Sequence, residues 1–357
     1  MIPAVVRALA DDEVLTREIP TLRLDMSRAV KLSGARGYHG KATFFLLDAG
    51  GVPEAVMKVA RSPSAGWSLR REHWALRYAR RRSPSGTRLP REYFVGRIDG
   101  HWVCVQEAMS GVPMATLLRE QPSAAQDAAE RAVHWIGAWT KTTERDTGRG
   151  PRAAAGRRRV LTQLSRLEQN VPWSPHEKSA LRDLTDAWLT CEGRTCCLHG
   201  DYWYGNLLID GEGTLGVLDW EFAQSDGPLF YDLFFFLVSL LAFQWSTSYS
   251  QAVLKLIGGE RDAWRDFAAN ALTAHARALR VPADALGVNI AVAVALLVER
   301  DRAARWKDAE AGYIDAYHFE PSASGASFEE ELRSGYKYLP ALSEILRAGW
   351  RCCGRWL

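Results

Sequence analysis

Short apolar stretches punctuated by glycine dominate the chain between residues 29 and 106. Apolar and polar positions alternate in four of these stretches, and glycine-containing turns join them in pairs, which predicts two β-hairpins. Between the hairpins, Leu69, Trp74 and Leu76 recur at roughly helical spacing, which predicts one helix over 68–81. Five short strands with one helix inserted after the third make a small β-rich lobe. The four hairpin strands are residues 41–48, 54–60, 91–98 and 101–109.

From Ser110 onward the apolar spacing becomes that of helices. Residues 122–142 place four alanines and two tryptophans on one face, behind Ser123 and Gln126 in the spacing of a capping box. The expected division is therefore an N-terminal extension (1–26), a β lobe (27–106) and a helical lobe (107–357). Further helices are expected at about 159–170, 175–191, 230–244, 262–279 and 284–308.

One β-like insertion interrupts the helical lobe, with the sequence LHGDYWYGNLLID followed by TLGVLDWEFA. It reads as strand, loop, strand, turn, strand and loop, which brings Asp201, Asn206 and Asp219 to the same end of a hairpin. Carboxylates and amides flanked by apolar strands need a hydrogen-bond partner or a cation where water is scarce. The alternative is that Asp201 and Asn206 only cap loops.

An Asp, four intervening residues, an Asn, and an Asp leaving the next strand form the catalytic arrangement of kinases. Phosphoryl transfer needs a metal to neutralise the phosphates and a carboxylate to orient the attacking hydroxyl. Mg²⁺ prefers hard oxygen ligands, which Asn206 and Asp219 supply. Asp201 would then accept the proton of the acceptor hydroxyl.

These motifs resemble those of the aminoglycoside phosphotransferase and choline kinase family of small-molecule kinases. The family's H-G-D-x-x-x-x-N loop is matched from His199 to Asn206, its D-W pair begins at Asp219, and a G-P step is followed by D-L at Asp232. Asp232 would hold the backbone of the catalytic loop. The resemblance covers residues 27 to about 245 and implies an α+β, bilobal protein-kinase-like fold that uses ATP and Mg²⁺.

The same resemblance assigns nucleotide-binding roles in the β lobe. Lys58 would hold the α- and β-phosphates, with Glu72 as its ion-pair partner. The carbonyl of Gln106 and the amide of Ala108 would face the adenine edge. Three glycines ahead of the strand 41–48 would form the phosphate loop, although their G-x-x-G-x-x-G spacing departs from G-x-G-x-x-G. They are Gly34, Gly37 and Gly40.

Composition and charge narrow the class of protein. The chain has 357 residues, 47% hydrophobic and 24% charged, as in ordinary globular proteins. Its longest apolar runs, 233–243 and 285–298, are shorter than the ~20 residues that span a bilayer. The six cysteines form no C-x-x-C, so reduced thiols are expected. Residues 1–20 have no apolar core of a signal peptide, being interrupted by Asp11, Asp12 and Glu13, so a cytoplasmic location and no membrane partner are expected.

Charge is unevenly spread, with a net +8 for residues 1–105 and −5 for residues 106–357. The basic runs 77–91 and 148–159 contain Gly, Pro and Ser, so they are expected in solvated loops or at loop edges, with binding of a specific acidic partner as the alternative. They lack the interleaved aromatic residues of a nucleic-acid groove, so no nucleic-acid partner is expected. The negative balance favours a cationic substrate, and the most acidic stretch is 309–332.

Several assignments stay open. Glu221 either helps to hold the metal or substrate or lies at the surface, and His199 is expected to be structural. Trp203 and Trp220 either stack on a sugar ring or belong to the core.

The class of kinase follows from what the motif lacks. Gly200 stands where protein kinases have the Arg of H-R-D, and only twelve residues separate Asp219 from Asp232, which leaves no room for an activation loop. The expected function is ATP-dependent phosphorylation of a hydroxyl on a small molecule, such as an antibiotic, sugar or amino alcohol, with no obligate protein partner. A non-catalytic pseudokinase is the alternative, and the choice between ATP and GTP is open.

Overall fold

The structure is a computed structural model that describes residues 29–31, 40–145, 151–191, 193–305 and 337–349. The chain folds into two compact units. The first contains the described residues up to Ala128 together with Asn206–Ala223, and the second contains Ala129–Gly205 and the described residues from Gln224 onward. Residues 107–128 and 206–223, expected in the helical lobe, therefore cluster with the strands of the first unit.

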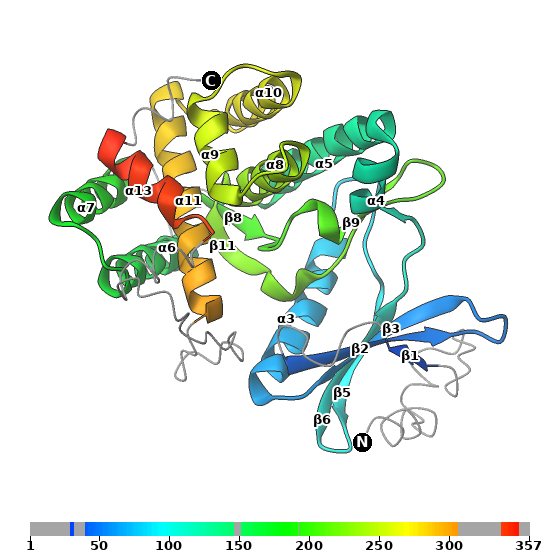
Figure 1. The fold of residues 1–357 in the computed structure, drawn as a ribbon. Coiled ribbons are helices and arrows are strands. Elements are labelled where there is room, and N and C mark those ends of the chain that lie inside the picture. Colours follow the sequence, from blue (N-terminus) through cyan, green and yellow to red (C-terminus); the bar gives the residue numbers. More distant parts are fainter. Residues whose placement is uncertain (1–28, 32–39, 146–150, 192, 306–336, 350–357) are drawn as a thin grey trace, which may run out of the picture. The chain divides into compact units, whose positions relative to one another are not determined.

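An antiparallel sheet of five strands forms the centre of the first unit, in the order β1-β2-β3-β6-β5 (Figure 1). Lys58 on β3 lies opposite Thr43 on β2 and Cys104 on β6. One face buries an apolar cluster that includes Phe44 and Met57, as the alternation of side chains along strands requires. The five strands are β1 (Ala29–Lys31), β2 (Lys41–Leu47), β3 (Pro53–Ala60), β5 (Glu92–Ile98) and β6 (His101–Glu107).

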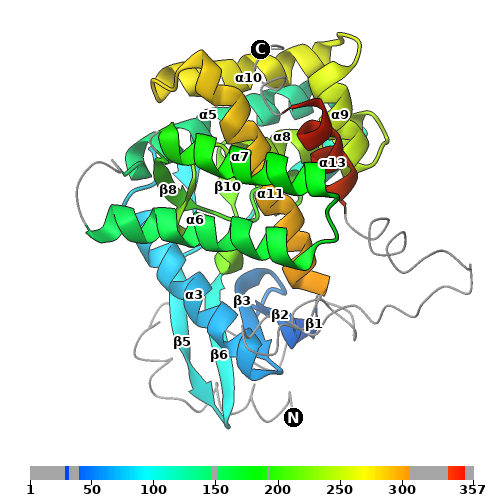
Figure 2. The same cartoon turned by 90° about the vertical axis from the view of Figure 1, so that its left-hand side faces the viewer.

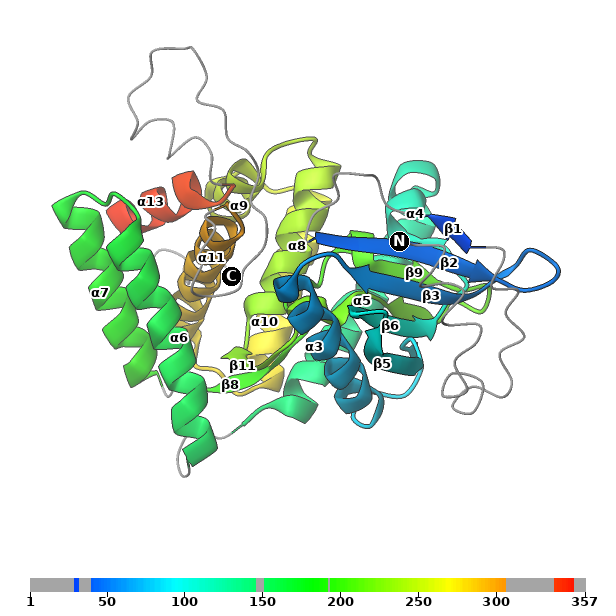
Figure 3. The same ribbon diagram turned by 90° about the horizontal axis from the view of Figure 1, so that it is seen from below.

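Helix α3 (Pro63–Arg80) follows the third strand, as expected, and packs against β3, β5 and β6 (Figure 3). Its start is defined by Ser62, whose hydroxyl accepts the amide of Ala65 at 3.3 Å. Leu69 and Leu76 are buried, but Trp74 is 59% exposed. The expectation that Trp74 shares their face is wrong, because a separation of two positions from Leu76 turns a helical side chain to nearly the opposite side.

A second, four-stranded sheet in the first unit has the order β4-β10-β9-β7. Its centre is the antiparallel hairpin of β9 and β10, in which Leu207 lies opposite Val217. The short helix α4 (Met114–Glu120) follows β7 and contacts both β7 and β9. The strands are β4 (Thr87–Arg88), β7 (Val112–Pro113), β9 (Leu207–Ile209) and β10 (Leu215–Val217).

Helices dominate the second unit, where α6 and α7 lie side by side and α13 contacts α7 (Figure 2). Helix α11 contacts α6, α7, α8 and α13. Helix α5 starts in the first unit and ends in the second. The helices are α5 (Pro122–Thr143), α6 (Pro151–Asn170), α7 (Pro175–Thr190), α8 (Tyr231–Gln244), α9 (Tyr249–Gly258), α10 (Ala263–Ala278), α11 (Ala283–Arg305) and α13 (Leu339–Ala348).

A two-stranded sheet of β8 (Thr195–Leu198) and β11 (Gln224–Pro228) lies within the second unit. Helix α6 contacts this sheet through Gly156, where an added Cβ would lie 2.9 Å from the Thr195 hydroxyl and 3.0 Å from Asp226 Cβ. The loop expected for the basic run 148–159 is therefore wrong for its residues 151–159. Glycine here allows close packing of a helix rather than ending it.

Other boundaries also differ from those expected. Helix α5 begins at Pro122, so Ser123 lies inside its first turn and does not cap it. Helices α4, α9 and α13 were not expected at all. For α9 a signal was present, since Ser248 and Gln251 form a capping box. The acidic stretch 309–332 lies outside the described residues.

In the part of the chain that the structure describes, no single helix is long and apolar enough to cross a bilayer. Two pairs of helices reach that length and composition only when joined across sharp bends, α8 with α9 and α10 with α11. The apolar run 233–243 lies in α8, where Leu233–Ala242 are all buried within the fold.

Candidate active site

A buried ion-pair cluster in the first unit joins β3, α3 and the segment after β10. Lys58 Nζ lies 2.6 Å from Glu72 Oε1 and 2.9 Å from Asp219 Oδ1. Burial by itself lowers the pKa of Lys58, but the carboxylates of Asp219 and Glu72 outweigh it and hold this pKa well above its usual value. The structure thus contains the pair of Lys58 and Glu72 that the sequence predicts, with a lysine that stays charged.

Asn206 and Asp219 flank the β9–β10 hairpin at its open end. The Asn206 carbonyl accepts the Leu218 amide at 2.9 Å, which extends the pairing one step beyond the strands. Asp219 then adopts left-handed backbone angles (φ 60°, ψ 68°). Asp tolerates this conformation better than most residues, and such outliers concentrate at functional sites.

This end of the hairpin suits a magnesium ion that keeps most of its ligands as water or phosphate. One carboxylate and one amide oxygen are hard donors, and Mg²⁺ is typically held in proteins by one or two carboxylates plus substrate phosphates. Among the described residues, no group of three or more His, Cys, Asp or Glu side chains is arranged to hold a metal. A fully protein-ligated site is thus not seen there, and the donor set fits a nucleotide-bound Mg²⁺.

Glu221 is a member of the same cluster rather than a surface residue, since it is only 3% exposed. Its carboxylate forms a buried ion pair with Lys41 and accepts the hydroxyl of Ser68 at 2.7 Å. Its carbonyl accepts the side chain of Arg71. Lys41 was not predicted as a site residue, although its place directly after Gly40 at the start of β2 was a signal in the sequence.

The phosphate loop is only partly described. Gly34 and Gly37 lie outside the described residues, whereas Gly40 has φ +58° and its carbonyl accepts the Arg61 amide at 2.6 Å. A Cβ added to Gly40 would lie 2.9 Å from the Ser62 hydroxyl. Gly40 therefore has a structural reason to be glycine that is independent of any phosphate.

The amide of Ala108, predicted to face the adenine edge, has a backbone partner in the structure. The amide of Ala108 donates to the Glu54 carbonyl at 3.0 Å, so β6 stays paired with β3 beyond Gln106. The sequence motif correctly places the end of the sheet near Gln106 but misses how far the pairing continues.

The part of the predicted catalytic loop from His199 to Gly205 lies in the second unit, and its start is held by Asp232, as the sequence predicts. Asp232 at the start of α8 accepts the amide of His199 at 2.6 Å and that of Gly200 at 2.9 Å. Gly200 has φ +79°, which L-residues with a side chain rarely adopt. His199 is fully buried, and its Nδ1 accepts the Asp201 amide at 3.2 Å, which agrees with a structural role.

Asp201 also has a partner that the sequence did not reveal. The Arg300 side chain, from α11, forms an ion pair with the Asp201 carboxylate and donates to the Gly200 carbonyl at 3.0 Å. Ninety-nine residues separate the two charged groups along the chain, so no local pattern connects them.

The tryptophans near the motif differ in accessibility. Trp220 is 1% exposed and donates from its indole to the Val217 carbonyl at 3.3 Å, so it belongs to the core. Trp203 is only half-buried. Only Trp203 of this pair can offer a ring surface to a substrate.

Protonation of Asp232 provides a test of the loop. Burial raises the pKa of this carboxyl to about 7, although the Gly200 and His199 amides and Arg300 lower it, while Asp201 raises it further. Below pH 7 the protonated group holds the two amides less strongly. Turnover should therefore fall as pH is lowered through about 7. Asp232→Asn should be roughly 10-fold slower than the parent at pH 8, because one of the two backbone amides loses its acceptor. Its kcat should show no such dependence on pH near 7, because Asn does not titrate there.

Stability should move in the opposite sense. The folded pKa of about 7 lies above the ordinary Asp pKa of 3.8, so the contribution of Asp232 to stability is fully present below pH 3.8 and is lost as pH rises through 7. Melting temperatures of the parent and Asp232→Asn at pH 5 to 9 measure it. As pH rises, the melting temperature of Asp232→Asn should increase relative to that of the parent, because Asn stays neutral. A difference in melting temperature that does not change with pH would contradict the raised pKa.

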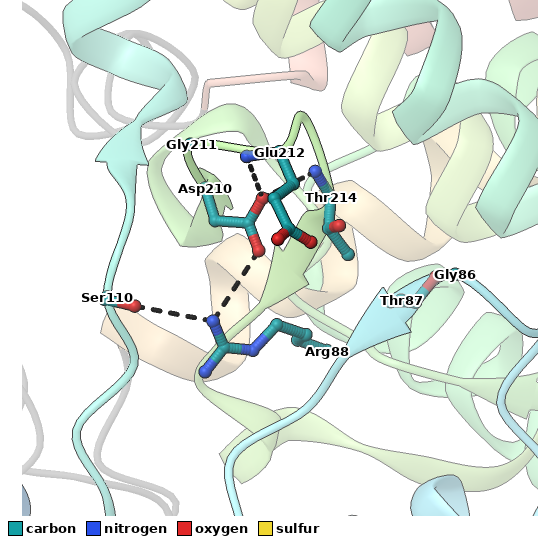
Figure 4. Close-up of a pocket in the computed structure, with 8 residues that line it drawn as sticks. All are labelled: Gly86, Thr87, Arg88, Ser110, Asp210, Gly211, Glu212 and Thr214. Atoms are coloured by element: carbon teal, nitrogen blue, oxygen red, sulfur yellow. Dashed lines mark hydrogen bonds and ion pairs between the residues drawn. The ribbon is translucent and has the colours of Figure 1, made fainter.

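A surface hollow of about 530 Å³ in the first unit is lined by residues other than the predicted site residues (Figure 4). Arg88 extends across it, with Nη1 3.4 Å from the Ser110 hydroxyl and 3.6 Å from Asp210. Asp210 also accepts the amides of Glu212 and Thr214. Since these charges are paired, the arrangement fastens the β9–β10 turn to β4. The lining residues are Gly86, Thr87, Arg88, Ser110, Asp210, Gly211, Glu212 and Thr214.

Solved structures with the same fold include an aminoglycoside phosphotransferase. A thermostable mutant of APH(4)-Ia in its apo form is 13% identical, with a TM-score of 0.54 over 94% of this chain and 98% of that one. A ternary complex of APH(4)-Ia with AMP-PNP and hygromycin B is also 13% identical, with a TM-score of 0.54 over 95% and 98%. At this identity the likeness establishes the kinase-like fold alone.

A search of curated proteins found no match. The model of the phosphotransferase enzyme family (APH), in contrast, matches residues 34–269, about two thirds of the chain. The match includes Lys58, Glu72 and the whole segment from Asp201 to Asp232. The chain therefore belongs to the phosphotransferase enzyme family and has its α+β, kinase-like fold.

Proposed function

We propose that this protein transfers the terminal phosphoryl group of Mg·ATP to a hydroxyl group of a small molecule. The observation that carries the proposal is the charged lysine bridging two carboxylates, Lys58 with Glu72 and Asp219. One carboxylate is enough to balance the charge of a buried lysine, but Lys58 contacts two. The second, Asp219, lies at the end of the hairpin that also carries Asn206. Phosphates and a divalent cation require that combination of charges.

Lys58 would bind the α- and β-phosphates, and Asn206 and Asp219 would hold Mg²⁺, which neutralises charge on the phosphates. The acceptor oxygen would form a bond to the γ-phosphorus as the bond from that phosphorus to the β-phosphate oxygen breaks, releasing ADP. Asp201 would take the proton of the acceptor hydroxyl. Its backbone is already held by His199, and the preceding peptide by Asp232.

The acceptor is proposed to be an antibiotic, a sugar or amino sugar, or an amino alcohol. One solved structure with this fold contains hygromycin B, and the net charge of −5 over residues 106–357 favours a cationic molecule. We further propose that the protein acts in the cytoplasm without nucleic acid, membrane or an obligate protein partner.

A non-catalytic, nucleotide-binding role is the second candidate. The presence of Asp201, Asn206, Asp219 and Lys58 together argues against it, because a protein that only binds nucleotide does not need the proton acceptor Asp201. A pseudokinase would bind nucleotide but release no ADP with any acceptor.

Release of ADP or GDP in a coupled assay, across a panel of aminoglycosides, macrolides, sugars and amino alcohols, tests the proposal. Mg·ATP and Mg·GTP should be run in parallel, because the choice of nucleotide is part of the proposal. Asp201→Ala serves as the control for transfer. Nucleotide binding without release for every acceptor would favour the pseudokinase instead.

The proposed site should need no activating modification. In protein kinases the Arg of H-R-D contacts a phosphorylated activation loop, and Gly200 stands in its place here. The twelve residues between Asp219 and Asp232 are too few for an activation loop. Protein shown by mass spectrometry to be unphosphorylated should therefore be fully active. Activity that appeared only after treatment with a second kinase would contradict this.

A further inference from the structure

The guanidinium of Arg300 makes two contacts with adjacent residues of the catalytic loop. Nη1 donates to the Gly200 carbonyl at 3.0 Å, and Nη2 pairs with Oδ1 of Asp201. Both groups are largely shielded from solvent, with side-chain exposures of 27% for Arg300 and 13% for Asp201. One planar group thus contacts both the Asp201 carboxylate and the backbone carbonyl before it, which ties the side chain of Asp201 to the backbone of its own loop.

Arg300 is itself held in place by the second unit. Its guanidinium lies 4.8 Å from the centre of the Phe235 ring on α8, a distance typical of a cation–π contact. Arg300 lies near the end of α11. The α11 segment before it, Leu286–Val298, is buried. The contact is therefore presented by a rigid element and not by a mobile loop.

The catalytic loop contains no cation of its own. Residues 199–206 read HGDYWYGN, with neither Lys nor Arg. An ionised carboxylate in a shielded position needs a positive charge or several donors to remain there. Arg300 on α11 supplies that charge. Asp232 holds the same loop from α8 by accepting the backbone amides of His199 and Gly200.

We propose that Arg300 is a positioning residue, which orients the Asp201 carboxylate to accept the proton of the acceptor hydroxyl. The inference rests on the proposed function of Asp201. A base is effective only when it is held within hydrogen-bond reach of the proton and pointed at it. A lysine at position 300 would keep the charge but could not serve both loop oxygens in the same fixed geometry.

A double-mutant cycle with Asp201 tests the inference, with hydrolysis of Mg·ATP and Mg·GTP as the probe reaction. Arg300→Met should lower kcat by roughly 10- to 100-fold in the parent, while the KM for nucleotide changes less than about twofold. In an Asp201→Asn background, the same change should have no further effect on kcat. Arg300→Lys should recover part of the loss.

Arg302→Lys is the matched control, because Arg302 is a buried arginine two positions away that pairs with Glu299 within α11. It should perturb the melting temperature about as much as Arg300→Lys but leave kcat near the parent value. If Arg300→Met lowered kcat by the same factor in the parent and in the Asp201→Asn background, Arg300 would have only a structural role. Equal losses of kcat in Arg300→Lys and Arg302→Lys would lead to the same conclusion. If the parent itself hydrolyses neither nucleotide and transfers to no acceptor, the proposed function fails instead.

Discussion

Replacing Asp201 by alanine should lower turnover by roughly 10²- to 10⁴-fold, the range contributed by a positioned general base. Nucleotide affinity should change little, because the carboxylate acts on the acceptor hydroxyl and Lys58 lies in the other unit with its own partners. Steady-state transfer to the best acceptor of the panel measures kcat. Calorimetric titration with Mg·ATP or Mg·GTP measures the affinity.

Loss of the ion pair with Arg300 complicates the alanine variant, since it leaves a shielded guanidinium without this carboxylate. Asp201→Asn is therefore the second variant, because it keeps the shape of the side chain and an oxygen for Arg300 while it abolishes the base. It should be nearly as slow as Asp201→Ala and melt closer to the parent. Near-normal kcat in Asp201→Asn would show that the carboxylate is not the base.

The parts of the molecule that the sequence predicted well depend on local patterns. The alternation of residues 41–60 predicted β2 and β3 because an antiparallel hairpin places alternate side chains on one face. The H-G-D motif and the D-L step predicted Asp232 beneath the catalytic loop because both belong to one short, ordered stretch.

The parts that were missed depend on contacts between distant segments. Lys41 and Glu221 are 180 residues apart, and Asp201 and Arg300 are 99 apart, so neither pair leaves a periodic signal. At Gly156 the local sequence was misleading, because it indicates a loop. The residue lies in α6, where its contact with Asp226 leaves no room for a side chain. Tertiary packing decides such positions, and it is not visible in spacing alone.

Replacing Asp219 by alanine should weaken the binding of Mg·nucleotide by at least about 100-fold, a loss expected when a carboxylate ligand is removed from a phosphate-bound metal. Asn206→Ala should weaken it less, because an amide oxygen carries no net charge to the ion. The measurement is calorimetric titration of each variant with Mg·ATP and Mg·GTP.

Asp219 has two roles that can be measured separately, the proposed one as a ligand of Mg²⁺ and the observed one as a partner of Lys58. Asp219 Oδ1 lies 2.9 Å from Lys58 Nζ, so the alanine variant also removes a competitor for the lysine. Without Mg²⁺, in the presence of a chelator, the Asp219 carboxylate would repel the triphosphate. Asp219→Ala should then bind free nucleotide as well as the parent or better, the reverse of its effect with Mg²⁺.

Asp210→Ala provides the control on the same hairpin. Asp210 lies at the turn, where it pairs with Arg88 and accepts two backbone amides, at the opposite end of β9 from Asn206. Its loss should leave both titrations close to those of the parent, although the turn becomes less stable. If Asp219→Ala weakened binding equally with and without Mg²⁺, the carboxylate would serve only to hold Lys58, and the metal would have to be assigned elsewhere.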